Sequence, residues 1–266
     1  MKSLISLALI FTALASVATA HDTWVETNTN IVRTGDAIYT DLKLGNHGNH
    51  HRDFKLASKI GMEGLTWTVI SPSGEKFDAQ SVAVDTGYAP KEGFWNAKYV
   101  ADKPGLYTVS HTLDKIVNHG TAIRARKSGK TFFIVSDSLD QVPSDLTGFD
   151  QPLGHALELV PIENPVAPLG PGKPITVKLL LHGKPLADTV VSFIPRRETL
   201  AEDFDETYER KTNQQGEASF TPKSGDQYLV VAHLTDEDAK GEDFEKTAYT
   251  ATLTVIVPER CPCCGE

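Results

Sequence analysis

Short runs of alternating apolar and polar residues, separated by turn-forming residues, follow the first twenty positions of the chain. Side chains of a β-strand point alternately to its two faces, so this alternation predicts strands with one buried face. Gly, Pro, Asn and Asp between the runs predict turns. Helical spacing over three turns is absent, and the acidic stretch 199–210 fits a solvated loop. The expected strands are residues 37–44, 65–71, 94–100, 105–112, 131–135, 175–181, 189–194, 216–221, 227–234 and 249–257.

A polar, turn-rich stretch at 136–154 divides these strands into two sets. Domain boundaries commonly fall in such segments. The sequence therefore predicts an N-terminal β-sandwich over 21–136, a linker over 137–154 and a C-terminal β-sandwich over 155–258.

Each set contains a Gly turn that leads into a strand with an early tyrosine and a final histidine. These are Tyr107 to His111 in "DKPGLYTVSH" and Tyr228 to His233 in "KSGDQYLVVAH". In Greek-key sandwiches such a tyrosine places its ring in the core. The second set, with "GKPLADTVVSF" before it, also resembles transthyretin-like or Cna B-type repeats. We expect an all-β chain of two consecutive Greek-key, immunoglobulin-like β-sandwich domains, the second of them transthyretin-like.

Residues 1–20 have the features of a secretory signal peptide. Lys2 precedes an apolar stretch, and Ala18-Thr19-Ala20 fits the A-x-A cleavage pattern. The apolar stretch is short for a membrane span, and no second run of about 20 apolar residues follows. We expect cleavage between Ala20 and His21, a periplasmic or secreted protein, and no membrane span in the mature chain.

The charge balance is acidic. The chain has 26 Lys and Arg against 35 Asp and Glu, a net charge of −9, which becomes −10 when Lys2 is removed. Without basic runs, this balance argues against nucleic acid as a partner.

Cleavage before His21 would expose both an α-amine and an imidazole on one residue. These two nitrogens can close a chelate ring on a metal ion, and nitrogen ligands suit Ni²⁺, Co²⁺, Cu²⁺ and Zn²⁺. Asp22 could add an oxygen ligand or orient a ligating histidine. The alternative is that histidine follows the cleavage site by chance.

Other histidines extend this prediction. His47, His50 and His51 lie on the Gly/Asn-rich stretch "GNHGNHHRD", which is either a metal-binding loop or a solvated hairpin loop. By strand alternation, His111 shares a face with Tyr107, whereas His233 lies on the face opposite Tyr228. Each of these two is a candidate metal ligand or a hydrogen-bonded structural residue.

The three cysteines, Cys261, Cys263 and Cys264, all lie in a short tail at 259–266. They could bind a soft metal or take part in thiol–disulfide exchange, or they could belong to a tail without function. The rest of the chain has no cysteine and must be stabilised by its core.

Several motifs together resemble an exported bacterial family of unknown function that is often labelled nickel-uptake-transporter-like. They are "AHDTWVE" (20–26), "GLYTVSH" (105–111), the stretch 154–193 that begins "GHALELVP", and "NQQGEASFTPKSGDQYLVVAH" (213–233). The resemblance covers nearly all of residues 20–257. It implies a periplasmic accessory role in nickel or cobalt uptake, with His21, Asp22 and His233 at matching positions.

The combined prediction is a non-catalytic periplasmic protein that binds Ni, Co, Cu or Zn for uptake or buffering, with a membrane metal-uptake transporter as a partner. Motifs of hydrolases, zinc proteases and nucleotide-binding proteins are absent from the sequence. One alternative is an exported β-sandwich module without metal. A second is a copper-dependent oxidative enzyme with an N-terminal histidine site.

Overall fold

The computed structural model describes residues 21–45, 62–87, 93–118, 120–139, 142–143, 146–196, 198–201 and 203–260. In this part of the chain strands dominate, and one short 3₁₀ helix, η1 (Ala79–Val82), is present. The first half contains β1 (Asp22–Thr27), β2 (Ile31–Arg33), β3 (Ala37–Gly45), β4 (Leu65–Ile70), β5 (Lys76–Asp78), β6 (Val84–Asp85), β7 (Trp95–Val100), β8 (Gly105–Asn118) and β9 (Ala122–Ser136). The second half contains β10 (Leu157–Pro161), β11 (Ile175–Leu181), β12 (Lys184–Pro185), β13 (Val190–Pro195), β14 (Glu209–Lys211), β15 (Glu217–Phe220), β16 (Asp226–Asp236) and β17 (Lys246–Val257).

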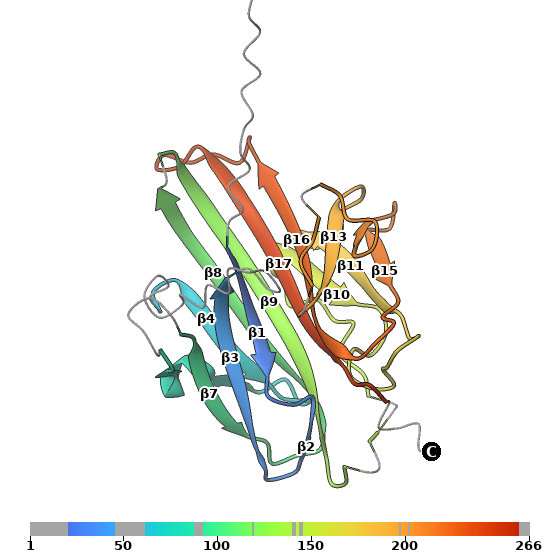
Figure 1. Cartoon of the computed structure of the whole chain (residues 1–266). Helices are drawn as coiled ribbons and strands as arrows, with labels where there is room; N and C mark the ends of the chain where they lie inside the picture. Colours follow the sequence, from blue (N-terminus) through green and yellow to red (C-terminus); the bar gives the residue numbers. More distant parts are fainter. Residues whose placement is uncertain are drawn as a thin grey trace, which may run out of the picture.

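One long sheet contains strands from both halves of the chain (Figure 1). Its order is β14-β13-β16-β17-β9-β8-β4-β5, and β2 pairs with the end of β9. The halves meet where β17 runs parallel to β9, from the pair Lys246↔Ile123 to the pair Thr254↔Thr131. Because this ladder is continuous, the two sandwiches share one backbone hydrogen-bond network.

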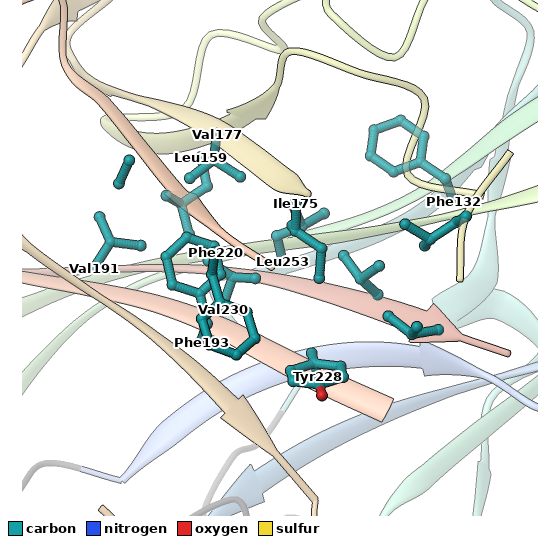
Figure 2. Packing of buried hydrophobic residues seen from close by; sticks show 14 of the residues in the cluster. Phe132, Leu159, Ile175, Val177, Val191, Phe193, Phe220, Tyr228, Val230 and Leu253 are labelled. Carbon is teal, nitrogen blue, oxygen red and sulfur yellow. The ribbon is translucent and has the colours of Figure 1, made fainter. Parts of the chain in front are cut away.

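Two smaller sheets cover opposite faces of the long sheet. The sheet β1-β3-β7-β6 packs on the β4, β8 and β9 region, and the sheet of β10, β11, β12 and β15 packs on the region of β13, β16 and β17. The first core lies under the sheet that contains β1, and the second core lies under the sheet that contains β10. Successive side chains of β9 enter the two cores in turn, since Phe133 lies in the first and Phe132 in the second. Figure 2 shows the second core, in which Phe193 and Phe220 stack with ring centroids 5.5 Å apart.

Each sandwich has the expected buried tyrosine near the start of a strand. Tyr107 donates its hydroxyl hydrogen to the Lys103 carbonyl at 2.9 Å, and Tyr228 donates to the Ser224 carbonyl at 3.3 Å. Both bonds reach back four residues, as in the tyrosine corner of immunoglobulin-like sandwiches.

Strand β1 is buried on both of its faces. It pairs with β3, and Val25 enters the first core. On its other face Trp24, 1% exposed, packs against Ile194, Leu229 and Val231 of the second half. The residues that directly follow the predicted cleavage site therefore pack between the two halves.

The expected strands are confirmed, and four of them, β8, β9, β16 and β17, are longer than expected by three residues or more. The first part of β9, Ala122–Lys130, was not predicted because it is rich in Arg, Lys and Ser. It forms a strand because β8 and β17 pair with it on both sides. The short strands β2, β5, β6, β12 and β14 were also missing from the prediction, as were β1 and β10, and β14 begins at the end of the stretch 199–210 that was expected to be a loop. The division into domains at 137–154 stays a prediction.

No helix in the described ranges is long and apolar enough to cross a membrane. The predicted signal peptide, the histidines His47, His50 and His51, and the tail cysteines Cys261, Cys263 and Cys264 lie outside the described residues.

Candidate functional site

The start of β1 lies on the end of β16. The Asp22 carboxylate oxygen Oδ1 is 2.7 Å from Nε2 of His233. Asp22 is largely buried, with 14% of its side chain exposed, whereas the His233 side chain is 55% exposed. Asp22 directly follows the predicted N-terminal histidine, and the contact joins it to a histidine in the second half of the chain, 211 positions away in the sequence.

A row of residues across the long sheet forms the floor of this site. His233 pairs with Thr250, and Thr250 pairs with Lys127 of β9. Lys127 donates a hydrogen bond from Nζ to the backbone carbonyl oxygen of His21. His21, Asp22, Lys127 and His233 therefore form one cluster, which we call the N-terminal cluster. No local pattern marks Lys127 as a site residue, because the strand expected at 131–135 begins after it.

Two opposing effects set the charge on His233. Burial lowers the pKa of His233. The negative charge of Asp22 and the hydrogen bond between the two side chains raise it by a larger amount, so the net shift of the pKa is upward. Burial lowers the pKa of Lys127, and Asp22 opposes that shift. The cluster thus balances one carboxylate against two basic side chains.

His111 lies inward, as its strand position predicts, and is fully buried. It pairs across the sheet with Gly129, where an added Cβ would come within 2.6 Å of the His111 Nε2 atom. Burial lowers the pKa of His111 to about 3, although the nearby Thr23 backbone opposes this shift. Neither ring nitrogen has a hydrogen bond of normal geometry to a described residue. His111 is therefore an uncharged core residue beneath β1.

The structure does not bring the predicted metal ligands His111 and His233 together. His233 and His111 lie three strands apart and in neighbouring same-face rows, a separation on the order of 15 Å. Two imidazoles on one face cannot span that distance around an ion held at about 2 Å. No group of three or more His, Cys, Asp or Glu side chains within the described ranges is arranged to hold a metal.

A second buried cluster supports β1 a few residues further on. The Glu26 carboxylate accepts hydrogen bonds from Lys43, Arg196 and Gln227, the last at 2.7 Å. Trp24 Nε1 also donates to it at 3.0 Å. Burial raises the pKa of Glu26, but these cations and donors lower it by more, so Glu26 is ionised. Sequence reasoning missed this residue, since a lone glutamate in a short strand has no distinguishing pattern.

A third buried cluster lies on the opposite face of β9. Lys130 and Glu158 form an ion pair at 2.6 Å, and each side chain is 2% exposed. Glu158 also accepts hydrogen bonds from the backbone amides of Leu153, Gly154 and His155. The His155 ring contacts the Ser110 hydroxyl at 3.2 Å.

Acidification is expected to destabilise the protein through His155. Burial lowers the pKa of His155 from 6.5 to about 4 even though Glu158 opposes the shift. Between these two pH values the unfolded chain binds the extra proton, so stability falls as pH falls, by at most about 1.4 kcal/mol per unit. Urea unfolding at pH 7 and at pH 4.5 measures the free energy of unfolding at each pH. Between the two, this free energy should fall by about 1–2 kcal/mol more in the wild type than in a His155→Gln variant. If the free energy of unfolding falls equally in the two proteins, His155 is not the group that makes the protein sensitive to acid.

The fold defines an all-β protein of the β-sandwich class, with strand β1 packed between two sandwiches. Within that class the chain belongs to the family described as "Domain of unknown function (DUF4198)", which it matches over residues 18–236. No curated protein matches the chain.

Solved structures of low sequence identity are similar to the chain. A DUF4785 family protein from Legionella pneumophila is 11% identical with a TM-score of 0.29, and the match covers 78% of this chain and 52% of that protein. The chain thus spans about half of that protein's length. The mouse nectin-like molecule 4 ectodomain is 9% identical with a TM-score of 0.22, over 90% of this chain and 65% of that one. The fibronectin(III)-like modules of Clostridium thermocellum CbhA are 11% identical with a TM-score of 0.23, over 88% and 94%.

Proposed function

We propose that this protein is exported, is cleaved before His21, and binds a divalent transition metal at the N-terminal cluster for uptake or buffering. The ligands are the α-amine and imidazole of His21, with His233 as the second histidine. Asp22 acts as an oxygen ligand or as the group that orients His233. The metal is one of Ni, Co, Cu and Zn, and the protein is not an enzyme.

The observation that carries this proposal is the 2.7 Å contact between Asp22 and His233. It supports a site in which the new N-terminus and a histidine from the second domain approach each other. The buried position of β1 supports it further, because Trp24 and Glu26 hold the strand in place within a few residues of His21. A rigid strand limits the entropy that a metal ligand loses on binding. The family resemblance to nickel-uptake proteins agrees with a metal, and a membrane transporter is then the partner.

Native mass spectrometry of protein purified after export tests the proposal, since one mass gives both the first residue and any bound metal. Cys261, Cys263 and Cys264 are replaced by serine, and His47, His50 and His51 by alanine, so that these segments do not contribute. We expect a chain that begins at His21 and binds one ion of Ni²⁺, Cu²⁺ or Zn²⁺. Affinity should fall about 100-fold in His21→Ala and about 10–100-fold in His233→Ala.

His182→Ala is the matched control. His182 is an exposed histidine that contacts Tyr249 on the far side of the sheet, with ring centroids 5.8 Å apart. It should keep wild-type affinity. A mature chain that starts at another residue, or equal losses in His182→Ala and His233→Ala, would overturn the proposal.

The second candidate is an exported β-sandwich module without metal. It is favoured by the finding that the described residues contain no group of three metal-ligating side chains. A ligand that binds the native state raises the melting temperature. If Ni²⁺, Cu²⁺ and Zn²⁺ all leave the melting temperature of the mature protein unchanged, this second function replaces the first.

A further inference from the structure

A polar cavity of about 190 Å³ lies on the opposite face of β9 from the N-terminal cluster. Its floor is formed by two cross-strand pairs of β8 and β9, Thr112↔Ser128 and Asp114↔Arg126. Its wall is the segment 154–157, which is fixed to the floor because Ser128 donates a hydrogen bond to the Leu157 carbonyl at 2.7 Å. The wall is therefore fixed to the floor, and the cavity borders the second core, because Ala156 and Leu157 of the wall pack in that core.

The charges around this cavity leave a guanidinium in excess. Arg124 binds the Asp114 carboxylate through two hydrogen bonds, both of 2.7 Å. The same carboxylate is 3.2 Å from Nε of Arg126. One carboxylate thus faces two arginines. Glu158, the next acidic group toward the cavity wall, is already paired with Lys130.

Arg126 is held in place but keeps its hydrogen-bonding capacity. Its guanidinium lies over the Tyr249 ring, 5.9 Å from the ring centroid, and its side chain is 33% exposed. Apart from the ion pair with Asp114, it has no polar bond to a residue in the described ranges. A planar guanidinium with free terminal nitrogens matches the two oxygens of a carboxylate or phosphate.

From this arrangement we infer that the cavity is a binding site for a small oxyanion, held by the Arg126 guanidinium and the Thr112 hydroxyl. The Thr112 hydroxyl is 2.7 Å from that of Thr66, and it can donate to the ligand while it accepts a hydrogen bond from Thr66. The ligand carries a carboxylate or a phosphate group, and the cavity limits it to a small molecule. Lys127 also borders the cavity, but its side chain points to the opposite face of β9 from that of Arg126 and bonds to His21 there, so the two proposed sites use different side chains.

Chemical-shift titration of the ¹⁵N-labelled mature protein tests this site, with inorganic phosphate and acetate as separate probes at constant ionic strength. We expect saturable shifts of the amides of Thr112, Arg126 and Gly154 with at least one probe. The probe that binds more tightly identifies the group that the site prefers. Shifts that do not saturate with either probe, or that arise elsewhere, would overturn the inference.

Four variants complete the test. Arg126→Gln should bind the preferred probe at least tenfold more weakly, and Arg126→Lys, which keeps the charge without the planar fork, should fall between it and the wild type. Arg33→Gln, which removes an arginine that is 60% exposed on β2, should bind within twofold of wild type. If Arg126→Gln fails to fold, Arg126→Lys takes its place in the test. Wild-type affinity for the probe in Arg126→Lys, together with weaker binding in Arg33→Gln, would overturn the inference. His21→Ala should bind the anion normally, so failure of the metal proposal leaves this result unaffected.

Discussion

Replacing Glu158 with alanine is expected to lower the free energy of unfolding by about 3–5 kcal/mol, the usual cost of leaving one partner of a buried ion pair alone. The substitution leaves the Lys130 ammonium, which is 2% exposed, without its counter-ion. It also leaves the amides of Leu153, Gly154 and His155 without their acceptor. Since these groups join β9 to the segment before β10, the loss should affect both halves of the chain together. Urea unfolding monitored by tryptophan fluorescence measures it.

Two controls separate the effect of burial from that of charge. Glu217→Ala removes a glutamate that pairs with Lys178 at 3.4 Å, where the two side chains are 33% and 37% exposed, and should cost less than about 1 kcal/mol. The double variant Lys130→Met/Glu158→Leu removes both charges and should recover the part of the loss that comes from the unpaired Lys130 ammonium, but not the part that comes from the three amides. If Glu158→Ala costs no more than Glu217→Ala, the ion pair does not stabilise the junction.

Replacing Trp24 with alanine is expected to cost about 3–5 kcal/mol, as for other large buried side chains. Trp24 is 1% exposed and fills the space between β1 and the strands β13 and β16. The variant also removes a hydrogen bond to Glu26, which lies at the centre of the second buried cluster. Because Trp24 positions the start of β1, the same variant should weaken metal binding if the proposed function is correct. Unfolding in urea and metal affinity are measured on the same preparation.

Trp24→Phe keeps part of the packing and should lose about half as much stability as Trp24→Ala. Tyr39→Ala removes an aromatic ring that is 43% exposed and should change stability by less than about 0.5 kcal/mol. A Trp24→Ala protein as stable as Tyr39→Ala would show that β1 does not hold the two halves together.

Candidate site residues were found from the sequence only where a chemical pattern was visible. A histidine after a cleavage motif pointed to His21 and Asp22, and strand alternation gave the correct faces for His111 and His233. Alternation could not show that His111 lies across the sheet from Gly129, far from His233, because register is set by strands that are distant in sequence. It could not show Lys127 or Glu26 either, since Lys127 bonds to His21 and Glu26 to Arg196 and Gln227, all more than a hundred positions away in the sequence.

The sequence by itself determined the all-β class, most of the strands and the buried tyrosines, because these depend on local alternation and on turns a few residues long. The tertiary structure alone decided that β17 pairs in parallel with β9, that β1 packs between the two halves, and that Asp22 reaches His233. Contacts of this kind depend on which strand edges and faces remain to be paired after the local elements form, and no short stretch of sequence contains that information.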